Sequence, residues 1–240
     1  MNKSLGIQII NYILRLIIRA ICKIDGEFDK VPKSGPLIMA VNHVNFMDAP
    51  LIASHLANRP LTVLAKEETW DNPVLGAIFN IWGAIPIKRG EVDRKAFQGA
   101  LDALAEGKIL AIAPEGTRSG TGILKRGYPG IVIIAQKANV PILPVAIYGV
   151  ESFWSNIKKL KRTKLHFSVG APFYLNPSTS VMSREERQEI ADEIMHQIAK
   201  LLPPNYHGYY TGTVTRQPKH LAFKINNYNQ NHLSPFKSQL

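Results

Sequence analysis

A histidine and an aspartate follow an apolar run in the stretch LIMAVNHVNFMDAP. On a continuous helix, His43 and Asp48 are five positions apart and would point about 140° away from each other. A turn between them lets the carboxylate reach the imidazole, fix its tautomer and leave the other ring nitrogen as a base. The pattern therefore favours proton abstraction. The alternative is a core histidine beside an aspartate that caps the next helix.

A second group of charged and small residues, PEGTR, follows the apolar run ILAIA. Glu115 and Arg118 place opposite charges at the expected end of a strand, where an arginine can hold a phosphate in bidentate fashion. Gly116 permits a close approach of the backbone or a positive φ. The later glycines have neither Walker nor dinucleotide-fingerprint spacing, which argues against a nucleotide-binding loop here.

Two further stretches are less specific. In IPIKRG, Lys88 and Arg89 follow a short apolar run, and taken alone they predict a solvated basic turn. In VPILPV, over residues 140–145, two prolines bracket an apolar strand. Because proline lacks an N–H for the ladder, this pattern predicts an edge strand or the start of an element.

Strand-like and helix-like segments alternate through the middle of the chain and must position these motifs. Strands are expected over 36–41, 61–65, 84–88, 108–113, 141–147 and, as an alternating edge strand, 164–169. Helices are expected over 49–56, part of 72–82, 93–106, 130–138 and 183–202. The alternation predicts an α/β fold: a single domain with a largely parallel sheet flanked by helices. Functional side chains are then expected just beyond the carboxyl ends of the strands.

The first 24 residues form an apolar segment with one polar stripe, made of Gln8, Asn11, Arg15 and Arg19. Two arginines near its middle argue against a membrane span. The segment is not followed by a small-residue cleavage site, which argues against a signal peptide. We expect an amphipathic helix that docks in the membrane interface with its arginines toward lipid phosphates. The alternative is a helix that packs on the protein's own core.

The overall composition narrows the partners. The net charge is +11 and the pI is about 9.7, which favours anionic partners such as lipid head groups, phosphorylated substrates or nucleic acid. The single cysteine, Cys22, excludes an internal disulfide and is compatible with a reducing compartment. We divide the chain into an interface helix (1–24), a domain (25–204) and a basic polar tail (205–240) that we expect to be weakly ordered or peripheral.

Taken in order, the four motifs resemble those of the glycerolipid acyltransferase family, specifically its 1-acylglycerol-3-phosphate acyltransferases. NHVNFMD matches the family pattern NHxxxxD, and IPIKR, PEGTR and VPILPV match the second, third and fourth motifs. The matches lie within residues 36–148. Two positions depart from the family: Asn45 stands where serine is common, and Lys88 stands where an acidic residue is common.

The resemblance implies a glycerol-3-phosphate acyltransferase-like fold and transfer of a fatty acyl group from acyl-CoA or acyl carrier protein to lysophosphatidate. It implies His43 as the base and Asp48 as its partner, with no metal and no organic cofactor. Glu115 would bind the glycerol hydroxyl or lock Arg118 in place. The implied substrate-binding residues are Arg89, Glu115, Gly116, Thr117 and Arg118.

The implied partner is an anionic membrane surface, and the implied location is the cytoplasmic face of the cell membrane, as a peripheral or monotopic protein. A basic cluster is either part of that surface or a loop without a partner; it comprises Lys158, Lys159, Lys161, Arg162 and Lys164. The nearest alternative is the same chemistry on another lysolipid or on glycerol 3-phosphate. A remote alternative is a non-enzymatic basic module for nucleic acid, for which the sequence contains no binding motif.

Overall fold

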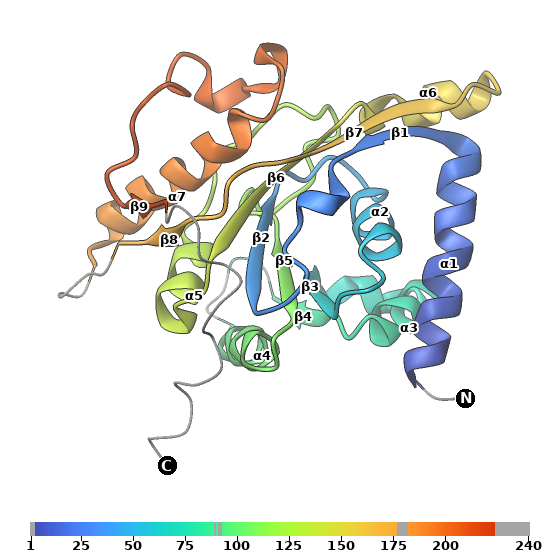
Figure 1. Cartoon of the computed structure of the whole chain (residues 1–240), viewed down its shortest axis with the longest axis horizontal. Helices are drawn as coiled ribbons and strands as arrows, with labels where there is room; N and C mark the ends of the chain where they lie inside the picture. Colours follow the sequence, from blue (N-terminus) through green and yellow to red (C-terminus); the bar gives the residue numbers. More distant parts are fainter. Residues whose placement is uncertain (1–2, 89, 91–92, 177–181, 224–240) are drawn as a thin grey trace.

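A largely parallel sheet lies at the centre of the protein (Figure 1). The computed structural model describes residues 3–88, 90, 93–176 and 182–223. Across the sheet the order is β1-β7-β6-β2-β5-β3-β4, and every neighbouring pair is parallel except β6 and β7. The strands are β1 (Cys22–Gly26), β2 (Leu37–Val41), β3 (Leu61–Lys66), β4 (Ile85–Ile87), β5 (Ile109–Ile112), β6 (Ile142–Tyr148) and β7 (Thr163–Val169).

Helices cover both faces of this sheet, as the alternating sequence pattern predicted. One face packs against α4, α5 and α7, and the other packs against α1, α2 and α6 (Figure 1). The helices are α1 (Lys3–Ile21), α2 (Asp48–His55), α3 (Pro73–Ile81), α4 (Arg94–Ala105), α5 (Gly130–Ala138), α6 (Phe153–Lys158) and α7 (Arg184–Ala199). A small second sheet pairs β8 (Tyr174–Leu175) with β9 (Leu221–Ala222) in antiparallel fashion. Short 3-10 turns occupy Phe28–Lys30, Glu67–Asp71, Val150–Ser152, Pro204–Tyr206 and Gly208–Tyr210.

The central strand β2 brings the chain to the histidine. All five of its residues are buried, because Ile38 and Ala40 face one core and the other three face the opposite core. Burial on both faces explains why the sequence shows an unbroken apolar run instead of alternation. The parallel neighbours β5 and β6 end at the same edge, so the segments that follow them meet there.

The N-terminal helix is shorter than predicted, because strand β1 follows it directly. The helix ends at Ile21, and Cys22 already pairs with Thr163 of β7. The guanidinium of Arg162 donates to the carbonyl oxygen of Arg19, in the last turn of the helix, and to that of Cys22 at 2.6 Å, so it satisfies a carbonyl at this end of the helix. Strand β1 therefore forms the edge, and the prediction of an edge strand over 164–169 is wrong. The alternation in β7 instead reflects one core-facing side and one more exposed side.

Helix α1 packs on the protein and also leaves an apolar face uncovered. It contacts α2 and α3, and Asn11 in its predicted polar stripe is buried, where it accepts a hydrogen bond from Trp82 Nε1 at 3.0 Å. Arg15 and Arg19 are exposed. The exposed large apolar residues of this helix are Ile9, Tyr12, Ile13, Leu16 and Ile17. Within the described residues, none of the helices combines the length and the apolar character needed to cross a bilayer.

The prolines of VPILPV predicted either an edge strand or the start of an element. The edge position is wrong because β6 lies inside the sheet, whereas Pro141 does directly precede the first residue of β6. Ile142 donates its N–H to Phe173, on the side of β7, and in a strand residue 144 faces the same side. The ladder with β7 begins only at Val145. The N–H that Pro144 lacks therefore faces the segment beyond β7, and no bond to β2 is lost.

The chain after Leu202 packs against the domain, which its polar composition did not predict. Tyr210 is 2% exposed. Its hydroxyl accepts a hydrogen bond from the N–H of Gly127 and donates one to Asp192, both at 2.8 Å. The prediction of weak order is therefore wrong for residues 205–223, because the buried side chains of Tyr210 and Leu221 anchor them. Residues 224–240 of the predicted tail lie outside the described residues.

Candidate active site

The imidazole of His43 lies against the carboxylate of Asp48 at the carboxyl edge of the sheet. Nδ1 of His43 is 2.7 Å from Oδ2 of Asp48. The side chain of Asp48 is 5% exposed and that of His43 is 21% exposed, so the carboxylate is shielded while the ring remains accessible. With Nδ1 held by the carboxylate, Nε2 is the nitrogen that can accept a proton. The structure thus has the turn that the spacing of these two residues required.

Backbone amides of the intervening loop hold Asp48 in this position. Its Oδ2 accepts hydrogen bonds from the N–H groups of Val44 at 2.8 Å and Asn45 at 3.1 Å. Asp48 is the first residue of α2 and Met47 is the N-cap, so the prediction that Asp48 caps the helix is wrong. The reason is that its carboxylate folds back to bind the loop before the helix.

Two asparagines fasten this loop to the end of β6. The amide of Asn42 donates to the carbonyl of Ile147 at 2.8 Å and accepts from the N–H of the same residue at 2.7 Å. Asn45 donates to the carbonyl of Val150 at 2.9 Å and accepts from the N–H of Met47 at 2.9 Å. An amide supplies both a donor and an acceptor for these two contacts. Asn45, which departs from the family pattern, thus joins its own loop to the 3-10 turn after β6.

Glu115 binds the backbone of the loop that joins His43 to Asp48, called the histidine loop below. Its two carboxylate oxygens accept the N–H groups of His43 at 2.8 Å and Lys125 at 2.9 Å, and the residue is 1% exposed. Burial raises the pKa of this carboxyl above its ordinary value, although both backbone hydrogen bonds oppose that shift. This positioning contact was part of neither role predicted for Glu115.

The segment that carries Arg118 runs directly beside the histidine loop. The N–H of Ser119 donates to the carbonyl of His43 at 2.7 Å, and that of Gly120 donates to the carbonyl of Val44 at 2.9 Å. The guanidinium of Arg118 is exposed and makes no hydrogen bond or ion pair with the described part of the chain. A cation next to this backbone contact is therefore available to an anionic ligand.

The other predicted residues are distributed as follows. Gly116 has φ +67°, and a Cβ there would lie 3.3 Å from the ring of Tyr128, so this turn requires glycine. Thr117 is exposed on the same segment. Arg89 lies outside the described residues. The structure therefore joins the first and third motifs through direct contacts between their loops.

The sequence of the chain matches the family model described as Acyltransferase over residues 23–148, which is more than half of its length. The chain belongs to the acyltransferase family. The matched region extends from β1 to the end of β6, so it contains all four motifs that predicted this family.

Two curated relatives of this acyltransferase are 1-acyl-sn-glycerol-3-phosphate acyltransferases. The protein from Borreliella burgdorferi is 27% identical over 178 residues, covering 72% of this chain and 69% of the relative. The protein from Bacillus subtilis is 24% identical over 174 residues, covering 72% of this chain and 84% of the relative. A lyso-ornithine lipid O-acyltransferase from Pseudomonas aeruginosa is 34% identical over 113 residues, covering 47% and 43% of the two chains.

The fold of this acyltransferase also matches a solved structure. The crystal structure of the 1-acyl-sn-glycerophosphate acyltransferase PlsC from Thermotoga maritima aligns with a TM-score of 0.62. Sequence identity is 24%, and the alignment covers 83% of this chain and 79% of the other. The similarity shows that both chains have the same fold.

In this acyltransferase, a segment outside the four motifs, residues 206–210, binds residues 124–127, which continue the loop that carries Arg118 (the Arg118 loop). The N–H of Leu124 donates to the carbonyl of Tyr206 at 2.9 Å, and the N–H of Tyr209 donates to the carbonyl of Leu124 at 3.1 Å. Tyr210 holds the same stretch through Gly127. The sequence contained one signal for this contact, the aromatic run YHGYY within an otherwise polar region.

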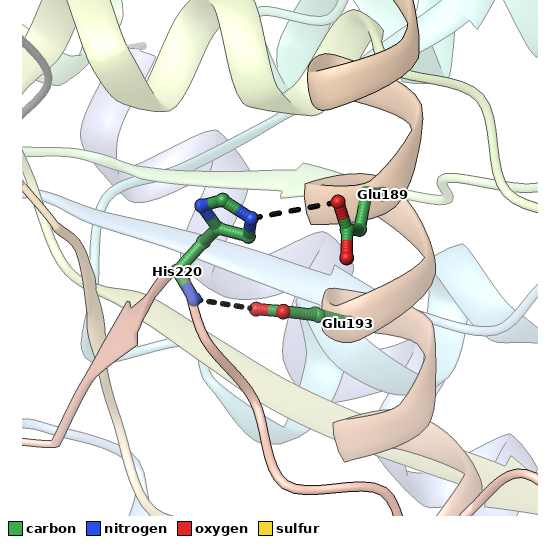
Figure 2. Close-up of side chains that lie close together, drawn as sticks. All are labelled: Glu189, Glu193 and His220. Carbon is green, nitrogen blue, oxygen red and sulfur yellow. Dashed lines mark hydrogen bonds and ion pairs between the residues drawn. The ribbon is translucent and has the colours of Figure 1, made fainter.

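One group with metal-like spacing lies outside the four motifs, between α7 and the segment before β9. Ligand atoms of Glu189, Glu193 and His220 all lie within 4.8 Å of one another (Figure 2). Both oxygens of Glu193 accept backbone N–H groups, from Lys219 at 2.8 Å and His220 at 3.0 Å. Glu189 faces the ammonium of Lys219 at 3.1 Å. These contacts describe a junction between two segments in which the carboxylates already have donors.

Proposed function

We propose that this acyltransferase moves a fatty acyl group from a thioester, carried by coenzyme A or acyl carrier protein, to the free hydroxyl of 1-acylglycerol 3-phosphate. The product is phosphatidate. One observation carries the proposal: the His43–Asp48 pair, with its carboxylate shielded, lies beside a segment with an exposed Arg118 whose guanidinium has no partner among the described residues. A base and a phosphate-binding cation are the two groups that this acceptor requires.

In this mechanism His43 acts as a general base. Nε2 takes the proton from the acceptor hydroxyl while the hydroxyl oxygen attacks the thioester carbonyl carbon. Asp48 balances the positive charge that forms on the imidazole. When the tetrahedral intermediate collapses, the carbon–sulfur bond breaks and the thiolate takes the proton back from His43. The products are an ester and a free thiol, and no acyl-enzyme forms.

The phosphate of the acceptor is assigned to Arg118, with Arg89 as a second cation. Arg118 leads into the backbone contacts of Ser119 and Gly120 with the histidine loop, so a phosphate held there brings the glycerol hydroxyl toward His43. Gly116 allows the turn that presents this segment. Thr117 supplies an exposed hydroxyl at the same edge.

We also propose that α1 docks the enzyme on an anionic membrane, peripherally or monotopically, at the cytoplasmic face. The uncovered apolar face of α1 suits burial among acyl chains, and Arg15 and Arg19 suit contact with lipid phosphates. Both substrates carry long acyl chains, so a membrane-bound enzyme meets them where they partition.

The decisive experiment compares acceptors. Purified protein is given acyl-CoA or acyl carrier protein donors with lysophosphatidate, a phosphate-free lysolipid or glycerol 3-phosphate. We expect transfer to lysophosphatidate and an Arg118→Ala variant whose acceptor KM rises at least about tenfold, with the donor KM unchanged. His43→Ala should abolish transfer in a folded protein. If the enzyme instead prefers the phosphate-free lysolipid, the proposed acceptor is wrong. This acceptor is included because the Pseudomonas aeruginosa relative is a lyso-ornithine lipid O-acyltransferase.

A further inference from the structure

A shallow basic depression of about 440 Å³, largely open to solvent, lies on the surface beyond the carboxyl end of β6, and neither the motifs nor the mechanism accounts for it; it is called the cavity below. It lies between the carboxyl end of β6 and the start of β7. Its lining includes Tyr148, Lys161, Arg162, Lys164, His166 and Tyr206. The cavity is thus rich in cations and in aromatic rings that can pack against an organic group.

The position of the cavity is fixed relative to His43. Tyr148 and Gly149 line it, and the two residues on either side of them, Ile147 and Val150, are bonded by Asn42 and Asn45 of the histidine loop. The cavity therefore belongs to the same edge of the sheet as the base.

The charge around the cavity is predominantly positive. Lys161 and Lys164 are exposed on its wall, and Lys23 lies beside Lys164 in the β1–β7 register. Two carboxylates face the same region. Asp25 lies 3.2 Å from the ring of His166, and Glu151 accepts the hydroxyl hydrogen bond of Tyr206 at 2.6 Å.

The lysines that line the cavity have ammonium groups available to bind a ligand. Arg162 is already used by the end of α1, whereas the ammonium groups of Lys161 and Lys164 make no ion pair with the described residues. Ser152 and Asn156 also line the cavity, although the amide of Asn156 already donates to the hydroxyl of Thr163 at 3.3 Å. Ammonium groups together with neutral donors in a hollow suit a phosphate on a polar ligand.

We propose that this cavity binds the phosphate end of the phosphopantetheine-bearing acyl donor. This inference rests on the proposed acyl transfer. The acceptor phosphate is already assigned to Arg118, and the donor carries its phosphate at the far end of the pantetheine arm from the thioester. The donor therefore needs a second cationic site, away from His43 but at the same edge of the sheet. Coenzyme A and acyl carrier protein share this phosphate, and coenzyme A carries further ones.

The first test measures binding without turnover. Calorimetric titration of the full-length protein uses coenzyme A and pantetheine, which lacks phosphate. We expect Lys161→Gln/Lys164→Gln to weaken coenzyme A binding about tenfold or more and to leave pantetheine binding unchanged. The matched control, Lys158→Gln/Lys159→Gln, removes the same charge from the C-terminal end of α6, outside the cavity lining, and should change neither affinity by more than about twofold.

The second test uses transfer kinetics and vesicle sedimentation. We expect the cavity variant to raise the KM for acyl-CoA about tenfold or more, with unchanged kcat and lysophosphatidate KM. An equal rise in KM with acyl carrier protein as donor supports the shared phosphate as the bound group. A rise with acyl-CoA alone would overturn that assignment and identify the nucleotide phosphates as the bound group.

Three further results would overturn this assignment: unchanged coenzyme A affinity in the cavity variant, an equal loss in the control variant, or reduced sedimentation with anionic vesicles at unchanged donor KM. The last result would make the cluster a membrane contact. Coenzyme A binding is measured without an acceptor. A wild type that binds coenzyme A in the cavity but acylates no lysolipid would refute the proposed function alone.

Discussion

At the scale of single residues, one oxygen of Asp48 joins the imidazole of His43 to the backbone of its loop. Oδ2 lies within hydrogen-bond distance of His43 Nδ1 and of two backbone N–H groups. The same carboxylate therefore sets the shape of the loop and the direction of the imidazole. Loss of its charge should affect catalysis more than folding, because an amide oxygen can still accept the backbone bonds.

We accordingly predict that Asp48→Asn lowers kcat about a hundred- to ten-thousand-fold, because no negative charge then balances the imidazolium. Both KM values should stay nearly unchanged. Steady-state kinetics measure this effect, and circular dichroism with thermal melting verifies that the variant is folded. A variant with kcat within about threefold of wild type would remove Asp48 from the mechanism.

The raised pKa of Glu115 predicts how the free energy of unfolding changes with pH. Its pKa is raised in the folded protein, so the folded state holds this proton more tightly than the unfolded state does. The contribution of this group to stability is therefore fully present below its unfolded pKa and is lost as pH rises through its folded pKa. The neutral Glu115→Gln variant lacks this dependence.

We therefore expect the difference in free energy of unfolding, wild type minus Glu115→Gln, to fall as pH rises from below the ordinary glutamate pKa toward neutrality. Urea titrations of both proteins across this range measure it. Because Gln has one acceptor oxygen and cannot accept hydrogen bonds from both N–H groups, the variant should also have a lower free energy of unfolding than the wild type at every pH. A difference that stays constant or grows with pH would contradict the raised pKa.

The sequence predicted the contact between His43 and Asp48 because both groups lie on one short loop, where spacing limits the geometry. It did not predict the contact between Glu115 and the backbone of His43, 72 positions away. Residue types do not reveal the direction of a distant N–H group. Distant backbone partners of this kind are visible only once the two loops are placed side by side.

At the scale of elements, buried strands were predictable and their neighbours were not. The strands β2 and β5 are buried on both faces and read as short apolar runs. The place of β7 depends on β1, whose sequence CKIDG is short and polar and continues directly from a helix. An alternating strand beside such a partner looks like an edge in sequence. Assignment of sheet edges therefore requires knowing which segment supplies the last strand.

The C-terminal segment gives a prediction at this scale. Tyr210 joins Gly127, in the segment after the Arg118 loop, to Asp192 on α7 through one buried hydroxyl. Tyr210→Phe leaves both partners without that hydrogen bond and should cost about 1–3 kcal/mol of stability. Urea unfolding measures the loss, and Tyr209→Phe is the matched control because Tyr209 is exposed. An equal effect in both variants would mean that the hydroxyl of Tyr210 contributes nothing specific.

At the scale of the whole molecule, the proposed membrane docking would depend on two interactions, electrostatic attraction to anionic lipid and burial of apolar side chains. The chain carries a net charge of +11, and α1 carries exposed apolar residues next to Arg15 and Arg19. Attraction to anionic lipid weakens as salt shortens the screening length from about 10 Å at 0.1 M to about 3 Å at 1 M. Burial of apolar side chains among lipid chains does not depend on charge screening. The two contributions should therefore separate in a salt titration.

We predict that sedimentation with anionic vesicles falls at least about tenfold between low and high salt, while a salt-resistant fraction persists. Arg15→Gln should lower binding about fivefold at low salt only, because a basic residue near anionic lipid contributes about 1 kcal/mol. Leu16→Ser should lower binding about tenfold at both salt concentrations, because it removes apolar surface. These adjacent exposed positions serve as controls for each other. If both variants bind like wild type at every salt concentration, α1 is not the docking element, and its apolar face must contact something other than the bilayer.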